Sequence, residues 1–228
     1  MDYSQYSHEE IARYLSDHPE FFDQYADLLA LVTIPDPHTG RAISITERQL
    51  FTLRDKVRTL ESKLSELIGF GEENDSISDK VHAMTVAMMA AADYPSLSRA
   101  LYAHLGGAFA VPHVGMRLWG VGSAEVLAGG ANRDFLPVGD SLKAFAGGLQ
   151  RPYCGAAAGQ DSVAWFNDFG PHLKSMVQIP LRDPTGACFG LMVLASEDPY
   201  RFYPDLGTLY LERIADLASA AFLRVLNP

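Results

Sequence analysis

The stretch from Ser175 to Leu226, SMVQIPLRDPTGACFGLMVLASEDPYRFYPDLGTLYLERIADLASAAFLRVL, decides the fold of this chain. Two runs of β-type residues, 175–181 and 187–195, flank the turn sequence RDPTG, and an amphipathic helical pattern begins at Pro204. Two strands joined by a short turn form an antiparallel hairpin, and a helix with one apolar face buries that face by packing across it. The sequence therefore predicts an α+β domain, an antiparallel sheet flanked by helices.

Composition and charge limit the classes of protein that fit. The chain has 228 residues, 48% of them hydrophobic, which suits one core of roughly 140 residues and a smaller appendage. Its formal net charge is −10, and residues 1–40 carry eight Asp or Glu against the single Arg13. Residues 41–63 are locally basic, but a charge run on a helix is usually a solvated face. An acidic chain is a poor match for nucleic acid, which we do not expect as the main partner.

The sequence carries no signal for a membrane or a disulfide framework. No apolar run approaches the ~18 residues of a membrane span, and the first ten residues are acidic, so we expect a soluble, cytoplasmic protein. Cys154 and Cys188 are the only cysteines, and we expect both to be reduced thiols. No His or Cys pair has metal-ligand spacing and no phosphate-binding glycine motif is present, so we expect no metal and no cofactor.

Residues 1–40 form a predicted helical hairpin followed by a linker. Apolar residues recur at helical intervals from Ile11 to Val32, with a break at Pro19, which indicates two short helices. Phe21 and Phe22 need cover that so small a hairpin does not provide, so the hairpin must pack on a later helix or on a second subunit. Pro and Gly residues between 35 and 40 mark a turn-rich linker.

A heptad pattern predicts a stalk helix over residues 41–83. On this register Lys56 takes a g position and Glu61 the following e position, which face each other in a parallel dimer. Two interpretations remain open, a parallel homodimer and an amphipathic helix packed on its own domain. Gly69 and Gly71 cost the helix about 1 kcal/mol each, so a bend or slack joint is expected there. The predicted dimer seam alternates a and d positions and comprises Leu50, Leu53, Val57, Leu60, Leu64 and Leu67.

The remaining segment, 84–228, is predicted to be one sensory-type domain. A helix over 97–109 opens at Pro95 with Asp93 or Ser96 as its cap, and residues 113–119 alternate as a strand with a short partner at 125–127. The middle of the domain is irregular, with short helices at 141–146 and ending at 165–168. Long irregular segments inside a compact domain are often functional.

Short motifs in this segment carry a resemblance to a known domain type. IPL at 179–181, FGL at 189–191 and RF at 201–202 occur in the order and spacing of the C-terminal half of a GAF domain. GAF domains are sensory modules that hold small ligands in a pocket over an antiparallel sheet, and the resemblance covers roughly residues 84–226.

Longer motifs resemble one family over nearly the whole chain. HPEFFDQYADLLALVTIPDP, SITERQLFTLRDKVRTLESKL, RPYCG and RFYPDLGTLYLERI closely resemble the bacterial domain-of-unknown-function family 484. That resemblance implies a cytoplasmic bacterial protein with a helical N-terminal extension and a GAF-like domain. It implies no catalytic residues.

A GAF pocket lies between the sheet and the irregular middle segments, so the resemblance directs attention to side chains there. Arg117 is the sharpest candidate, because a cation on a strand of an apolar domain needs a partner, and a ligand carboxylate or phosphate can provide one. The alternative is that its head reaches solvent or an internal acid such as Asp168. The aromatic rings of the set can stack on a planar ligand or simply pack in the core. The predicted pocket residues are Arg117, Trp119, Arg151, Tyr153, Cys154, Trp165, Phe166, Asp168, Met176 and Gln178.

Three functions fit these patterns. The first is a non-enzymatic sensory or regulatory module that binds a small molecule, dimerises through its stalk and signals to a protein partner. The second is a ligand-free scaffold whose acidic N-terminal hairpin docks another protein. The third is a redox enzyme resembling the free methionine sulfoxide reductases, with Cys154 as nucleophile, Arg151 lowering its pKa and Cys188 as resolving thiol. We favour the first, and expect Cys188 to be an inert thiol in an apolar strand.

Overall fold

The computed structural model describes residues 6–35, 42–122 and 133–226. The chain falls into two compact units, Met1–Glu72 and Glu73–Pro228. The second unit combines helices with a four-stranded antiparallel sheet, so the predicted α+β class is confirmed. The predicted strand at 125–127 lies outside the described residues.

The first unit begins with three short helices, α1 (His8–Asp17), α2 (Glu20–Gln24) and α3 (Ala26–Leu31). Ser7 and Glu10 form a capping box at the start of α1, and the predicted break at Pro19 separates α1 from α2. The ring of Phe21 lies 4.9 Å from that of Tyr25, and Phe21 and Phe22 are half-buried.

Two short strands, β1 (Thr33–Pro35) and β2 (Ala42–Ser44), pair antiparallel. The sequence predicted neither strand, since it assigned β1 to the hairpin and linker of residues 1–40 and β2 to the stalk helix of residues 41–83. Three residues are too few for an alternating pattern to be recognised, which is why the strands were missed.

The helix α4 (Ile45–Ala90) runs without interruption through Gly69 and Gly71, so the predicted joint is wrong. Neither glycine has positive φ, and a Cβ added at either would meet no atom within 4 Å. Nucleation is the costly step of helix formation, and propagation on both sides offsets the penalty of about 1 kcal/mol per glycine. The helix ends where Arg224 Nη2 donates to the carbonyls of Met88 (3.2 Å) and Ala91 (2.9 Å).

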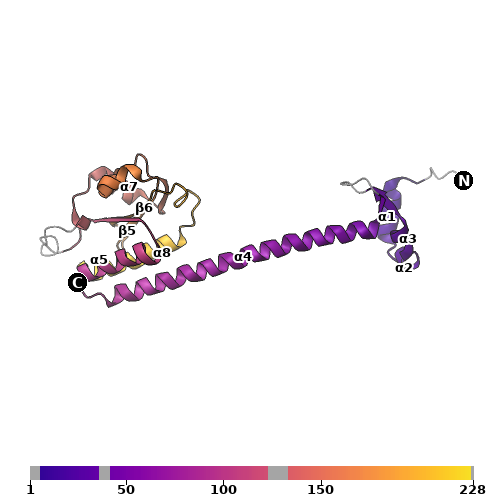
Figure 1. Ribbon diagram of the computed structural model, residues 1–228, viewed down its shortest axis with the longest axis horizontal. Helices are drawn as coiled ribbons and strands as arrows, with labels where there is room; N and C mark the ends of the chain where they lie inside the picture. The colour runs from indigo at the N-terminus through magenta and orange to yellow at the C-terminus, as the bar shows by residue number, and fades with distance from the viewer. Residues whose placement is uncertain (1–5, 36–41, 123–132, 227–228) are drawn as a thin grey trace. The chain divides into compact units, whose positions relative to one another are not determined.

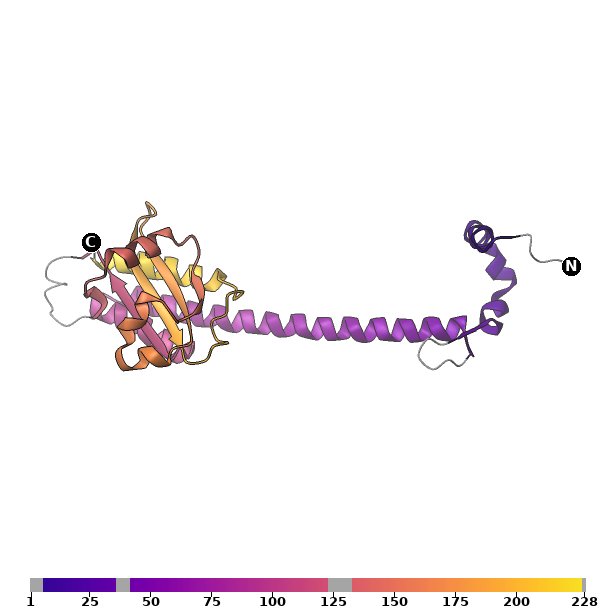
Figure 2. The ribbon, with the colours of Figure 1, turned by 90° about the horizontal axis from the view of Figure 1, so that it is seen from above.

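The sheet of the second unit has the order β3-β6-β5-β4, with β3 (His113–Leu118), β4 (Tyr153–Ala156), β5 (Ser175–Arg182) and β6 (Cys188–Ser196). All of its strand pairs are antiparallel, and the predicted hairpin is β5–β6. Figure 2 looks onto the sheet with its strands side by side. The C-terminal helix α8 (Leu209–Leu226) starts later than predicted, because Pro204 and Asp205 form a turn in which the Leu206 N–H donates to the Tyr203 carbonyl (3.0 Å). At the start of α8, Thr208 Oγ1 donates to Glu212 Oε1 (2.7 Å).

Helices cover both faces of this sheet (Figure 1). One face packs on α8, and α5 (Tyr94–Ala103) and the C-terminal part of α4 contribute to the same core cluster. The N-cap of α5 is Asp93, one of the two predicted caps. A short π-helix, η1 (His104–Ala108), follows α5. The other face packs on α7 (Asp140–Gly148) and on the 3₁₀ segment η3 (Asp161–His172). Successive strand residues alternate between the two clusters, since Met192 and Leu194 join the first and Leu191 and Val193 the second.

Candidate functional site

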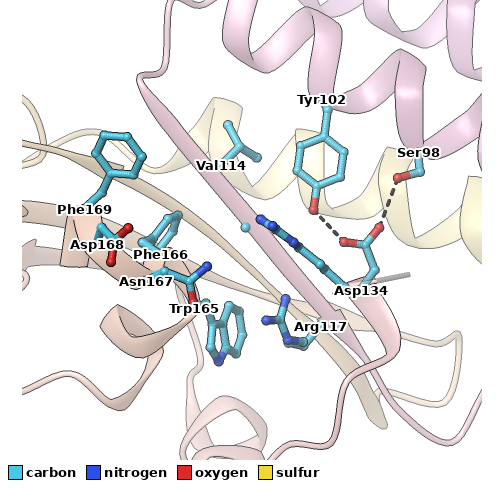
Figure 3. A pocket seen from close by; sticks show the side chains of 12 residues that line it. Ser98, Tyr102, Val114, Arg117, Asp134, Trp165, Phe166, Asn167, Asp168 and Phe169 are labelled. Atoms are coloured by element: carbon cyan, nitrogen blue, oxygen red, sulfur yellow. Dashed lines mark hydrogen bonds between the residues drawn. The ribbon is translucent and has the colours of Figure 1, made fainter. Parts of the chain in front are cut away.

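A pocket of about 610 Å³ lies beside β3, at one end of the described sheet (Figure 3). Its lining comes from four elements, namely α5, β3, the 3₁₀ turn η2 (Arg133–Phe135) and η3. Cavities of 300–1,000 Å³ with a few converging polar groups are typical of small-molecule sites in proteins. This pocket therefore has the size and the mixed lining of a ligand site.

Arg117 is the buried cation of this pocket. Its side chain is on the face of β3 that meets η3, and only 7% of the residue is exposed. Its Nη1 donates to the Met116 carbonyl (2.8 Å), and its guanidinium lies 4.7 Å from the ring of Trp165, beside it in Figure 3. The ion pairs among the described residues do not include Arg117, and burial lowers its pKa. The guanidinium keeps its charge, because its pKa starts far above neutrality.

Asp134 is the buried carboxylate of the pocket, 4% exposed. Three hydroxyls of α5 donate to it, from Tyr94 (2.6 Å), Ser98 (3.0 Å) and Tyr102 (2.7 Å). Burial and the charge of Asp134 raise the pKa of both tyrosines well above the ordinary value. Sequence reasoning missed this cluster, although its signal was present: hydroxyl residues recur at every fourth position of α5 and so share one helix face.

The backbone at Asn167 is strained. Its φ of 48° and ψ of −120° lie outside the regions that L-residues favour, and they kink η3 where it lines the pocket. β3 and η3 pack tightly against each other, because a Cβ added at Gly115 of β3 would lie 3.2 Å from Phe166 Cζ of η3. Glycine on β3 thus lets the Phe166 ring lie against the strand.

A family model described as "Protein of unknown function, DUF484" matches residues 2–224. The chain belongs to the DUF484 family. The DUF484 match covers both units and every described residue of the pocket, and the family carries no assigned activity. A search of curated proteins finds no match to this chain.

In this DUF484 member, four of the predicted pocket residues come together and six do not. Arg117, Trp165, Phe166 and Asp168 line the pocket. Trp119 lines a separate cavity of about 380 Å³, and its Nε1 donates to the Cys188 carbonyl (2.9 Å). The remaining five predicted residues line neither cavity: Arg151, Tyr153, Cys154, Met176 and Gln178.

The core accounts for several of those residues. Met176 and Gln178 are fully buried beneath η3, where Ser162 Oγ donates to Gln178 Oε1 (3.1 Å) and Gln178 Nε2 donates to Gln160 Oε1 (2.7 Å). Arg151 is exposed. The strand positions of Met176 and Gln178 were predicted correctly, but the irregular segment that covers them could not be placed from sequence.

The two cysteines lie on opposite faces of the sheet. Cys154 packs against the cluster beneath α5 and α8, and Cys188 against the cluster beneath α7 and η3. The strand β5 separates them, since Cys154 pairs with Val177 and Val177 pairs with Leu194 far along β6 from Cys188. A disulfide needs Cα atoms within about 7 Å, which one intervening strand already exceeds. Burial also raises the pKa of both thiols, contrary to the lowered pKa that a nucleophilic Cys154 requires.

Within the described residues, no group of three or more His, Cys, Asp and Glu side chains converges as metal ligands would. None of the described helices combines the length and apolar composition needed to cross a bilayer.

Proposed function

We propose that this chain is a regulatory module that binds a small anionic ligand beside Arg117 and acts as a parallel homodimer held by α4. A sensory role is what the resemblance to GAF domains implies. The observation that carries the proposal is the buried Arg117 guanidinium at the wall of the 610 Å³ pocket.

Burying a cation is costly unless it meets an opposite charge or hydrogen-bond acceptors. A guanidinium has five N–H donors, and a carboxylate or phosphate accepts two of them in parallel. The Trp165 ring stacks near the same head group, and aromatic faces suit planar ligands. The ligand class we propose is therefore a planar or compact molecule that carries a carboxylate or phosphate.

The strained backbone at Asn167 and the kink in η3 offer a mechanism by which ligand binding could change the conformation of the domain. Strain of this kind persists only where surrounding contacts hold it, and a ligand in the pocket would add such contacts. Ligands shift a conformational equilibrium only through different affinities for its two states. We propose that ligand binding orders η3 and that a protein partner recognises the ordered state.

The apolar stripe of α4 supports the homodimer. The six seam residues from Leu50 to Leu67 are between 45% and 65% exposed in the single chain. Leucine and valine at a and d positions over three heptads form the pattern that a second helix covers in a coiled coil. A second copy of the chain would bury these side chains in register.

Tryptophan fluorescence tests the ligand site. The chain has two tryptophans, so Trp119→Phe leaves Trp165, beside the pocket, as the single reporter. Titration with sodium phosphate and with sodium benzoate, against sodium chloride at equal ionic strength, should change Trp165 emission saturably for at least one probe. Arg117→Met should abolish that change, whereas the exposed Arg151→Met should preserve it. An identical response in both arginine variants would refute the proposed site.

One observation favours a second candidate function, a scaffold whose N-terminal hairpin docks another protein. The first unit exposes large apolar side chains, with Tyr14 at 57%, Tyr25 at 55% and Leu31 at 75%. Such a surface suits a protein partner. Leu31→Ser alters the surface with little effect on the fold, so loss of a co-purifying partner in that variant, with ligand binding unchanged, would favour the scaffold.

A further inference from the structure

A second cavity, of about 340 Å³, lies on the sheet face that packs on α8 and shares no lining residue with the pocket beside Arg117. Its walls come from α4, η1, β6, α8 and the segment before α8. The walls are mainly aliphatic and aromatic, and several of them belong to the core cluster, including Leu105, Leu194, Phe202 and Ile214. An apolar ligand group would be well solvated by such walls.

Two cationic side chains lie at or near the wall of this apolar cavity. Arg201 lines it, and its Nη2 donates to the Phe109 carbonyl (3.0 Å). Its Nε is buried with no hydrogen-bond partner among the described atoms. Lys80 Nζ lies 6.0 Å from the Phe109 ring centre, which places a second cation near the same wall. A buried donor left unsatisfied costs roughly 1–3 kcal/mol, so Arg201 is poised to donate to an anion.

The backbone of the wall is also unusual. The element η1 is a π-helix, a rare form that is frequent at functional sites. It is closed by Ala110, a non-glycine residue with φ of 51°, and the Val111 N–H donates to the Leu105 carbonyl (2.9 Å). This strained exit turns the Phe109 carbonyl toward Arg201, which fixes the guanidinium at the cavity.

We propose that this cavity binds a small amphipathic carboxylate, with its hydrocarbon part among Leu194, Phe202 and Ile214 and its carboxylate on Arg201. A neutral hydrocarbon would bind weakly, because it provides no hydrogen-bond acceptor for the Arg201 guanidinium. A small hydrophilic anion would also bind weakly, because it makes no contact with the apolar walls. The cavity volume, near the lower limit for small-molecule sites, restricts the ligand to a short acyl or single-ring acid.

Occupancy of this cavity bears directly on how α4 is held. Ile77 of α4 and Tyr210 of α8 both line it, and Tyr210 Oη hydrogen-bonds to Ser78 Oγ (3.0 Å) and to the Asn74 carbonyl (3.1 Å). A bound acid would fill the space beneath this α4–α8 contact. The expected consequence is slower amide exchange in residues 74–82 of α4 when the cavity is filled.

Isothermal titration calorimetry with sodium octanoate, and with uncharged 1-octanol as matched control, tests this proposal. The native chain should bind octanoate at least tenfold more tightly than octanol, since hydrogen bonds to charged groups contribute about 1.5–3 kcal/mol. Arg201→Met keeps the apolar stem and should weaken octanoate binding by roughly tenfold or more. Arg151→Met, at an exposed arginine that lines neither pocket, should leave octanoate affinity unchanged.

A second variant covers the case in which Arg201→Met does not fold. Gly207 lines the cavity, and a Cβ added there meets no atom within 4 Å, so Gly207→Leu adds a side chain at the wall without a backbone clash. Loss of octanoate binding in this variant, with the circular dichroism and melting temperature of the native chain, supports the site. Absence of octanoate binding to the native chain, equal binding of octanol, or binding abolished by Arg117→Met instead of by the cavity variants would overturn the proposal.

Discussion

Replacing Asp134 by Ala is the sharpest perturbation of the pocket wall. The carboxylate is buried and accepts hydrogen bonds from Tyr94, Ser98 and Tyr102 of α5. Tyr94 is 3% exposed and Ser98 9%, so water does not readily replace the lost acceptor. The substitution therefore leaves buried hydroxyls without the partner that now satisfies them.

The expected cost follows from those contacts. A buried hydroxyl that loses its acceptor costs roughly 1–3 kcal/mol, and Tyr102, which is only half-buried, can recover part of its loss from solvent. The sum is about 3–6 kcal/mol, a large part of the 5–15 kcal/mol by which domains are typically stable. Asp134→Asn keeps the shape and one acceptor oxygen, so its cost should be about half as large.

Urea denaturation followed by circular dichroism measures both variants. The predicted order of unfolding free energy is native, then Asp134→Asn, then Asp134→Ala, with Tyr102→Phe within about 1.5 kcal/mol of native. In the double variant Tyr102→Phe/Asp134→Ala, the two costs should not add, because the residues share one hydrogen bond. A loss below about 1 kcal/mol for Asp134→Ala would refute the argument that this carboxylate organises the wall.

Four further outcomes follow from the structure. Leu60→Asp places a charge in the seam and should weaken self-association by at least about tenfold in sedimentation velocity, whereas dimerisation elsewhere would leave it unchanged. Gly69→Ala with Gly71→Ala should raise the helix stability of α4 by about 1 kcal/mol each, and a lower melting temperature would contradict a continuous helix. Because the pKa of Tyr94 is raised on folding, its contribution to stability is complete below about pH 10 and is lost as the pH rises further; Tyr94→Phe should flatten this alkaline decline. Oxidation with diamide should give no disulfide between Cys154 and Cys188 within one chain, and its detection by mass spectrometry would contradict the sheet topology.

The elements with strong local patterns were predictable from sequence, and the contacts between distant segments were not. The hairpin β5–β6 consists of two long runs of β-type residues with a turn signal between them, so its position followed directly. Asp134 is far from α5 in sequence, and its role depends on tertiary contact that no local pattern records. The joint at Gly69 and Gly71 was wrong because glycine propensity is a weak penalty within a long cooperative helix.

The residues of the candidate site were likewise predictable only in part. The cation Arg117 was predictable, because a charged residue on an apolar strand needs a partner wherever the other segments lie. Met176 and Gln178 were expected in the pocket from strand alternation, but η3 covers them, and the course of an irregular segment is not encoded in a short periodicity. The strain at Asn167 likewise appears only in the folded backbone.

Native mass spectrometry of the chain purified without added ligand is the decisive experiment for the proposed ligand-binding dimer, because it reports subunit number and retained small molecules together. We expect the native chain to be a dimer that carries a defined extra mass, and Arg117→Met to remain a dimer but lose that mass. A monomer, or an extra mass that Arg117→Met retains, would contradict the proposal.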